Sequence, residues 1–288
     1  MLKFLRLNVC PRIQADPNMI AGTGIPRIIH QTYPTKYLPE RLRDNVASLK
    51  NRNPGWKHCL YDDEDIEAFI SAEYGPAILN RYRRINPKYG AMRADLFRYL
   101  LLYRQGGVYL DIKSSFSRPL DQVLQPADSY ILSHWPARLR EWGDLWELKA
   151  AGTEEFQQCF IICAPGHPFL KAVIENALRN ITHYLPSIHG VGKIGVLRVT
   201  GPIAYTLAIW SIFERGPYRL VDSENDLGFV YSIYENQTHE SLFQNHYSSG
   251  TEPVVKLSPG RWLFSESLGI AKTSARHLRN FYRNRVRH

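Results

Sequence analysis

The 288-residue sequence lacks any run of about 20 uncharged apolar residues, the length that a membrane-spanning helix requires. Its longest apolar stretches, such as the one from Gly201 to Phe213, are too short and too polar to cross a bilayer. Near the amino terminus, Lys3 and Arg6 interrupt what would have to be the apolar core of a signal peptide. We therefore predict neither a transmembrane segment nor secretion by that route.

Cysteine is also scarce, and its spacing excludes the common zinc sites. The four cysteines include no CxxC pair and no Cys/His spacing typical of zinc. Cys159 and Cys163 lie in QQCFIICA, a run that indicates a buried strand, so we expect both to be reduced thiols of the core. This usage predicts a reducing, cytoplasmic setting.

Positive charge is abundant but unevenly distributed. The sequence has 36 Lys and Arg against 27 Asp and Glu, a formal net charge of +9 and a pI of about 9.4. With 44% hydrophobic residues it is too apolar to be disordered. Residues 272–288 contain six basic residues and no acid, which leaves +3 for the rest of the chain. A body so close to neutral, without a recognition motif, disfavours a nucleic-acid-binding protein.

The basic tail has helical spacing. Ala271, Leu278 and Val286 belong to an apolar stripe, and the basic residues form the stripe beside it. A basic amphipathic helix of this kind suits an anionic membrane surface, on the inner face of the membrane for a cytoplasmic protein. A solvated helix packed on the domain explains the pattern equally well. No linker divides the remainder, so we predict one domain over residues 1–270 and a basic amphipathic tail over 271–288.

The first half of the chain alternates between strand and helix patterns. Residues 25–34 form a short β-branched run closed by prolines, and residues 39–51 have helical spacing. A strand over 56–61 follows, and Asp62 or Asp63 then begins a helix that runs to about Tyr74. This order predicts an α/β protein with a mostly parallel sheet. Farther on, we expect a strand and helix over 156–178, a Gly-rich loop over 188–202 and a helix from about 203 to 213.

The segment from Tyr89 to Leu120 is the most informative. It predicts a helix over 92–104 that stops at Gly106-Gly107, followed directly by a strand over 108–112. Asp95 and Arg98 then share one face of the helix, where they bind sugar hydroxyls and phosphate or form a structural ion pair. Asp111 falls at the carboxyl end of a parallel strand, where α/β sheets bind ligands. It is either a metal ligand or a cap of the following loop.

Taken together, RADLFRYLLLYRQGGVYLDIK, the upstream IPRIIHQTY and, more loosely, TGP at 200–202 resemble the DXD-type glycosyltransferases of family 32. That family includes fungal initiating mannosyltransferases and bacterial capsule and lipooligosaccharide sugar transferases, and more distantly the glucosylating domains of clostridial toxins. The resemblance implies a single GT-A catalytic domain that binds a nucleotide sugar and a divalent metal, Mn²⁺ or Mg²⁺. It also implies transfer of the sugar with retention of anomeric configuration.

The resemblance also implies roles for individual residues. His30 and Gln31 of the first strand would line the nucleotide, Asp95 and Arg98 would bind sugar and phosphate, and Tyr109 would pack on the donor. Asp111 would be the first Asp of the DXD motif. Gln158, with its neighbour Gln157, falls where the family presents an amide near the transferred sugar. His246, with Trp262 downstream, would close the site and ligate the metal, although a lone histidine is equally a surface residue.

The sequence departs from the motif at its third position, where Lys113 gives DIK in place of DXD. A protonated lysine cannot ligate a metal and repels a bound cation. Three readings stay open: Asp111 holds the metal with waters and a later residue, Lys113 itself neutralises the diphosphate, or the site is degenerate. We count Asp95, Asp111, Lys113 and Gln158 as the catalytic set and expect weakened metal dependence.

These observations predict a glycosyltransferase that moves a hexose from a nucleotide sugar to a glycan or lipid-linked glycan acceptor. In retaining transfer, an oxygen of the leaving diphosphate helps to deprotonate the acceptor, so no separate protein base is required. If transfer were inverting, Glu147, Glu154 or Glu155 would be candidates for the base. The alternative function is a catalytically degenerate sugar-binding protein of the same fold.

Overall fold

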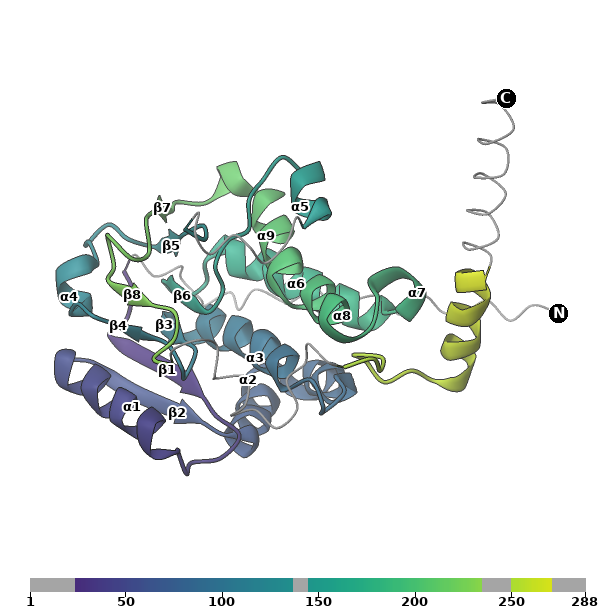
Figure 1. Cartoon of the computed structure of the whole chain (residues 1–288), viewed down its shortest axis with the longest axis horizontal. Helices are drawn as coiled ribbons and strands as arrows, with labels where there is room; N and C mark the ends of the chain where they lie inside the picture. The colour runs from purple at the N-terminus through teal and green to yellow at the C-terminus, as the bar shows by residue number, and fades with distance from the viewer. Residues whose placement is uncertain (1–23, 137–144, 235–249, 271–288) are drawn as a thin grey trace.

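The computed structural model describes residues 24–136, 145–234 and 250–270 (Figure 1). A six-stranded sheet in the order β2-β1-β3-β6-β5-β7 forms its centre. Its strands are β1 (Ile28–Thr32), β2 (Lys57–Tyr61), β3 (Gly107–Leu110), β5 (Tyr130–Leu132), β6 (Phe160–Cys163) and β7 (Arg219–Leu220). β1 pairs parallel with β2 and β3, and β5 with β7, whereas β6 is antiparallel to both of its neighbours. The predicted α/β class with a mostly parallel sheet is confirmed.

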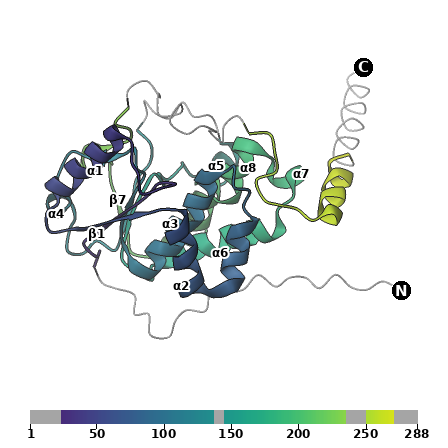
Figure 2. The same cartoon turned by 90° about the horizontal axis from the view of Figure 1, so that it is seen from below.

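Helices cover both faces of this sheet, and a two-stranded sheet of β4 (Ser115–Phe116) and β8 (Phe229–Val230) lies beside it. The labelled helices are α1 (Glu40–Arg52), α2 (Asp63–Arg84), α3 (Gly90–Gln105), α4 (Leu120–Val123), α5 (Trp146–Ala150), α6 (Pro168–His183), α7 (Pro186–His189), α8 (Gly192–Val199) and α9 (Pro202–Trp210), and a further helix covers residues 259–270. Figure 2 shows α1 and α4 on one side of the sheet and α2, α3 and α6 on the other.

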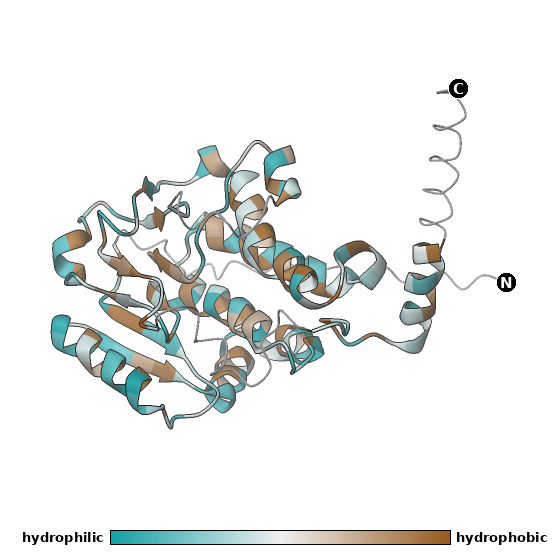
Figure 3. Cartoon of the chain, viewed as in Figure 1, coloured by the Kyte–Doolittle hydropathy of each residue, from teal (hydrophilic) through white to brown (hydrophobic). Residues whose placement is uncertain are grey.

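The alternation of side chains along the central strands divides the core into two clusters. Val108 and Leu110 of β3 pack in the cluster with Leu49 of α1, whereas Tyr109 points into the cluster with α3 and α6. Successive residues of a strand face opposite sides of a sheet, so both faces of β3 are buried. The outer surface of α1 is hydrophilic, whereas the central strands are mostly hydrophobic (Figure 3).

Two glycines make the direct turn from α3 into β3. Gly106 ends the helix at φ 62°, and a Cβ there would lie 2.7 Å from Cδ of Pro165. Gly107 follows at φ 96°, where a Cβ would approach the Ile28 carbonyl oxygen to 2.6 Å. Both the positive φ and the close backbone approach require glycine. The predicted boundary between helix and strand is therefore confirmed.

The predicted helix end at Tyr74 marks a kink. A capping box between Asp62 and Asp65 begins α2, as the acidic start indicates. Gly75 leaves the helical conformation with φ 70° and ψ −177°, and Pro76 begins a second helical segment that continues to Arg84. Proline suits the first turn of a helix, where its missing N–H is not needed.

One other prediction requires correction. Residues 192–199, which were expected within a Gly-rich loop, form α8, because Val196 and Val199 bury one side of the segment in the core. After residue 228, the described residues form the strand β8, and Val255 makes an isolated bridge with Ile85.

Cys159 and Cys163 are buried and free, as expected for core thiols. Burial raises the pKa of both thiols, so they stay protonated at neutral pH. In the described ranges, no helix has the length and hydrophobicity needed to cross a bilayer. The predicted tail, 271–288, lies outside the described residues.

Candidate active site

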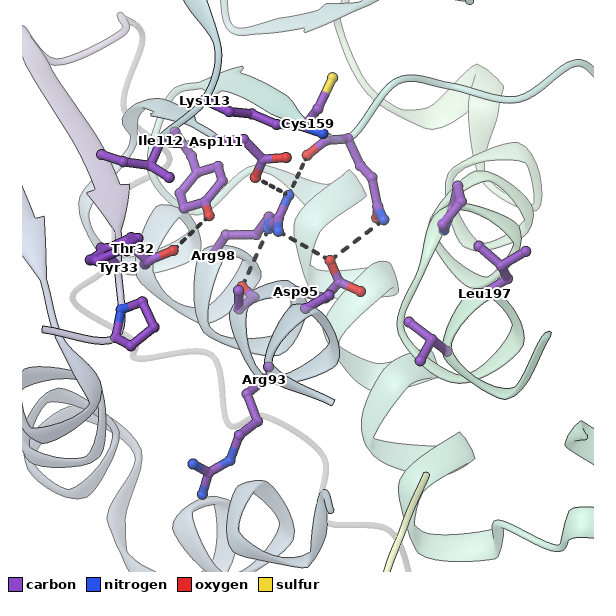
Figure 4. A pocket seen from close by; sticks show the side chains of 18 of the residues that line it. Thr32, Tyr33, Arg93, Asp95, Arg98, Asp111, Ile112, Lys113, Cys159 and Leu197 are labelled. Carbon is purple, nitrogen blue, oxygen red and sulfur yellow. Dashed lines mark hydrogen bonds and ion pairs between the residues drawn. The ribbon is translucent and has the colours of Figure 1, made fainter. Parts of the chain in front are cut away.

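A cavity of about 520 Å³ opens where β1 and β3 end. Its walls come from Thr32 at the end of β1, from the first half of α3, from the loop after β3 and, on the opposite side, from α8 (Figure 4). The carboxyl ends of parallel strands are where α/β sheets bind ligands. The charged residues of the wall are Asp63, Arg93, Asp95, Arg98, Asp111, Lys113, Glu155 and Lys193.

Arg98 lies at the centre of the wall between two carboxylates. Its guanidinium is 3.2 Å from Asp95 Oδ1 and 3.2 Å from Asp111 Oδ1, and Nη1 donates to the Gln158 carbonyl at 2.7 Å (Figure 4). The guanidinium also lies 4.4 Å from the centre of the Tyr109 ring. Burial alone lowers the pKa of Arg98, but Tyr109, Asp111 and Asp95 outweigh it and raise the pKa overall. Arg98 is therefore a fixed cation that orients both acids.

Asp95 is buried, and each of its two carboxylate oxygens has a partner. Its other oxygen, Oδ2, accepts from the Thr200 hydroxyl at 3.0 Å, so the TGP segment supports the site from the turn between α8 and α9. Burial raises the pKa of Asp95 to about 6, although Arg98 and the Thr200 hydrogen bond act in the opposite direction. The expected shared face of Asp95 and Arg98 is confirmed as an ion pair. Its predicted contact with sugar stays a prediction.

Tyr109 and Gln158 both line the cavity, as their predicted roles require. The Tyr109 hydroxyl lies 3.0 Å from the Thr32 hydroxyl, which joins β3 to β1 beneath Arg98. The Gln158 amide lies between the Tyr99 hydroxyl, from which it accepts, and Asp95 Oδ1 at 3.5 Å. Gln157 is buried, and its backbone N–H donates to the Ser133 carbonyl. Of the two amides, Gln158 is the one at the site.

The predicted positions of His30 and Gln31 require correction, because neither residue belongs to the cavity wall. The His30 imidazole is fully buried, with Nε2 at 3.1 Å from the Gly106 carbonyl and Nδ1 at 3.0 Å from the Tyr61 hydroxyl. Burial lowers its pKa to about 4, so it is neutral. The buried Gln31 side chain accepts from His58 Nε2 through its Oε1 at 2.8 Å. Both support β1, and the wall begins at Thr32.

Asp111 lines the cavity, and its side chain is 27% exposed. The turn after β3 is closed by the backbone, since the Ser114 N–H donates to the Asp111 carbonyl at 2.8 Å. Across the described parts of the chain, no group of three His, Cys, Asp or Glu side chains is placed to hold a metal ion. With Arg98 on its carboxylate and Lys113 two residues on, Asp111 does not fit a divalent cation with these residues alone. His246, the other predicted ligand, lies outside the described residues.

The wall also contains Trp135, the candidate base Glu155 and Tyr231, and Tyr231 was not assigned to the site from the sequence. Trp135 Nε1 donates to Glu155 at 2.7 Å, and its ring meets Tyr231 edge-on at 5.2 Å. Burial raises the pKa of Glu155 despite the Trp135 hydrogen bond and nearby Lys193. Tyr231 belongs to the aromatic segment FVYSIY, residues 229–234, which is the feature of the sequence that could have indicated its place at the site. Of the other predicted glutamates, Glu147 pairs with Arg198 instead.

Comparison with known proteins identifies the family. The glycosyltransferase sugar-binding region containing the DXD motif matches residues 39–130. Inositol phosphoceramide mannosyltransferase 3 of Schizosaccharomyces pombe is 32% identical over 231 residues, which cover 79% of this chain and 56% of that protein. Mannosyl phosphorylinositol ceramide synthase SUR1 of Saccharomyces cerevisiae is 31% identical, covering 66% of this chain and 43% of that protein. The chain spans about half the length of the curated relatives it matches.

Among solved structures, the PaToxG glycosyltransferase is similar at a TM-score of 0.46 and 15% identity, covering 85% of this chain and 87% of that chain. The ligand-free glycosyltransferase domain from the YGT toxin has a TM-score of 0.43 and 9% identity, covering 86% and 90%. The sheet of this chain is parallel except at β6. With the matched motif region and the sequence identity to fungal mannosyltransferases, the chain belongs to the DXD-containing glycosyltransferases of family 32.

Proposed function

We propose that this chain transfers a hexose from a nucleotide sugar to a glycan or lipid-linked glycan acceptor, with retention of anomeric configuration. The observation that carries this proposal is Arg98, held between Asp95 and Asp111 in the wall of the cavity at the carboxyl ends of the strands. Carboxylates accept hydrogen bonds from sugar hydroxyls, and nearby cations favour phosphate. The three side chains together suit a ligand that combines a sugar with a diphosphate.

The curated relatives narrow the substrates to be tested. Their names describe mannosyl transfer to inositol phosphoceramide and, for the Candida albicans relative at 27% identity, initiation-specific α-1,6-mannosyl transfer. Mannose is accordingly the first hexose to test, and a phosphoinositol lipid or a mannan-type glycan the first acceptor. The acceptor enters past Trp135 and Tyr231, whose rings give the cavity an apolar wall suited to the hydrocarbon faces of a sugar.

The proposed reaction takes place on one face of the sugar. The bond from the anomeric carbon to the diphosphate breaks and its electron pair leaves with the diphosphate. The acceptor oxygen forms the new bond from the same side, and its proton passes to an oxygen of the leaving diphosphate. Asp95 and Gln158 orient the hexose, while Arg98 and Lys113 supply positive charge toward the diphosphate. The chain's contribution is positioning and charge stabilisation, with no base of its own.

Transfer assays with GDP-mannose, UDP-glucose, UDP-galactose and UDP-N-acetylglucosamine test this function. We expect one donor to give a glycosylated acceptor whose anomeric configuration, read by NMR, equals that of the donor. An inverted product would contradict retention and direct attention to Glu155, the one predicted glutamate in the cavity wall. Binding of a nucleotide sugar with neither transfer nor hydrolysis would favour the degenerate sugar-binding protein.

We also propose that the chain works at an anionic membrane surface on the cytoplasmic side. The helix over residues 259–270 leads toward the basic tail and stands apart from the sheet and its covering helices (Figure 1). It exposes 49% of Trp262, 61% of Leu263 and 58% of Phe264. Adjacent exposed aromatic and aliphatic side chains, followed by basic residues, are typical of helices that lie in a membrane interface.

A further inference from the structure

The loop after β3 holds Lys113 rigidly in the cavity wall. The Lys113 ammonium donates to the Tyr231 hydroxyl at 3.0 Å and lies 4.2 Å from the centre of the Tyr231 ring. Its backbone carbonyl accepts from the N–H of Ile233 at 2.9 Å. On either side, the Asn45 amide donates to the carbonyls of Ile112 and Ser114 at 3.2 and 2.9 Å. The charge at position 113 therefore has a fixed place.

The charges around the motif balance without a metal ion. Asp95 and Asp111 are offset by Arg98 and Lys113, and all four side chains belong to the same wall. An aspartate at position 113, as DXD has it, would leave this group with two negative charges, which is the charge that one divalent cation neutralises. Replacing aspartate by lysine changes the charge of the wall by the same amount as a bound divalent ion.

The other described residues of the wall do not alter this balance. Outside the motif, the charged wall residues are the acids Asp63 and Glu155 and the bases Arg93 and Lys193, so the described wall is neutral as a whole. A nucleoside diphosphate that enters it meets the same total charge as in a site with two aspartates and a divalent ion. The electrostatic requirement for a metal at the diphosphate is thus already met by the chain.

We propose that Lys113, fixed by Tyr231, replaces the divalent cation at the donor's diphosphate, so that this chain binds a nucleoside diphosphate without added metal. The proposal rests on the nucleotide-sugar function given above and specifies how that site holds its donor. Lys113 contacts the phosphate oxygens through a charged hydrogen bond, and Arg98 keeps the Asp111 carboxylate oriented and neutralised beside it. Of the three readings of DIK, the geometry favours the lysine as the fixed cation.

Calorimetric titration with UDP and with GDP, in EDTA and in excess Mn²⁺, tests the proposal on the full chain. For the nucleotide that binds, we expect the wild-type dissociation constant to differ less than about threefold between the two conditions. Lys113→Asp restores the DXD spacing, so its affinity in EDTA should fall at least about tenfold and recover in Mn²⁺. Lys50→Asp, on the exposed side of α1 away from the cavity, makes the same charge change and should behave as wild type.

Lys113→Gln gives a second measurement that does not place an acid beside Asp111. It should bind the nucleotide at least about tenfold more weakly in EDTA than wild type does. Wild-type binding that disappears in EDTA and returns with Mn²⁺, or an unchanged affinity in Lys113→Gln, would overturn the proposal. If the folded wild-type protein binds neither nucleotide in either condition, the nucleotide-sugar function itself is wrong, and the role of Lys113 falls with it.

Discussion

Arg98 determines the shape of the site at the scale of single residues. Its planar fork reaches Asp95, Asp111 and the Gln158 carbonyl at once, which a single ammonium cannot do. Because all of these groups are removed from most solvent, each depends on the others for its charge or hydrogen bonds. A substitution that keeps the positive charge at position 98 but removes the planar guanidinium therefore tests whether the site depends on this geometry.

We expect Arg98→Lys to lower transfer by about a hundredfold or more, because lysine leaves one carboxylate without its partner. The free energy of unfolding should fall by about 3 kcal/mol, as for other buried ion pairs that lose one side. Initial rates and urea unfolding measure the two effects. Arg83→Lys, on the exposed side of α2 and paired with Glu67, is the matched control and should change neither.

The titration of Asp95 predicts an acid limit of activity. Burial raises the pKa of its carboxyl to about 6, so the charged form that pairs with Arg98 is present above that pH and is lost below it. The ratio kcat/KM should therefore decline as the pH falls through about 6. Asp95→Asn should show low activity without this decline. An unshifted limit near pH 4 in the wild type would contradict the assignment.

At the scale of secondary structure, the sequence predicts what local contacts determine. β1, α1, β2, α3 and β3 occur within a few residues of their predicted positions, because caps, glycines and hydrophobic periodicity act between near neighbours. The direction of β6 and the helix α8 were not predicted, since both depend on packing against distant strands and helices. His30 shows the same limit, because its partners, Tyr61 and Gly106, are far away in sequence.

His167 caps the start of α6 and makes the stability of the fold depend on pH. Its Nδ1 accepts from the Phe169 N–H at 3.2 Å at the start of α6, and its Nε2 donates to the Pro217 carbonyl at 2.9 Å. These two bonds require the neutral ring, and burial lowers the pKa to about 4. The unfolded chain takes up this proton below about pH 6.5 and the folded chain only below about 4, so stability declines as the pH falls between these values.

We expect His167→Asn, which retains a capping oxygen but does not titrate, to reduce this pH dependence. The slope of unfolding free energy against pH between 4 and 6.5 should be smaller in the variant by up to about 1.4 kcal/mol per pH unit. Urea unfolding at a series of pH values measures it. Identical slopes in the two proteins would show that the ring is already charged in the native state.

At the scale of the whole molecule, the uneven charge predicts where the protein binds. Truncation after Gly269 removes the basic tail, and the chain should then bind vesicles containing phosphatidylserine more weakly, by about 1 kcal/mol for each basic residue near the surface. Neutral phosphatidylcholine vesicles are the comparison, and sedimentation gives the bound fraction. Equal binding of truncated and full chains would exclude the tail as the membrane contact.

Two substitutions of exposed aromatic residues test whether apolar contacts, in addition to charge, hold the protein at the membrane. Phe264→Ser removes an exposed apolar side chain of the helix over 259–270 and should weaken vesicle binding even at high salt. Tyr37→Ser removes an apolar side chain that is 89% exposed, far away in sequence and near the start of α1, and should have no effect. If both variants bind as wild type does, this helix does not enter the interface.

The glycine turn between α3 and β3 has a consequence for how the active site forms during folding. Arg98 and Asp111 lie on one continuous segment, so only a short loop closes when they meet, and closing it costs little chain entropy. Contacts between near neighbours in sequence form fastest. The charged centre should therefore assemble early, before α8 and the aromatic wall arrive from the second half of the chain, and the cavity closes around a nucleus that is already in place.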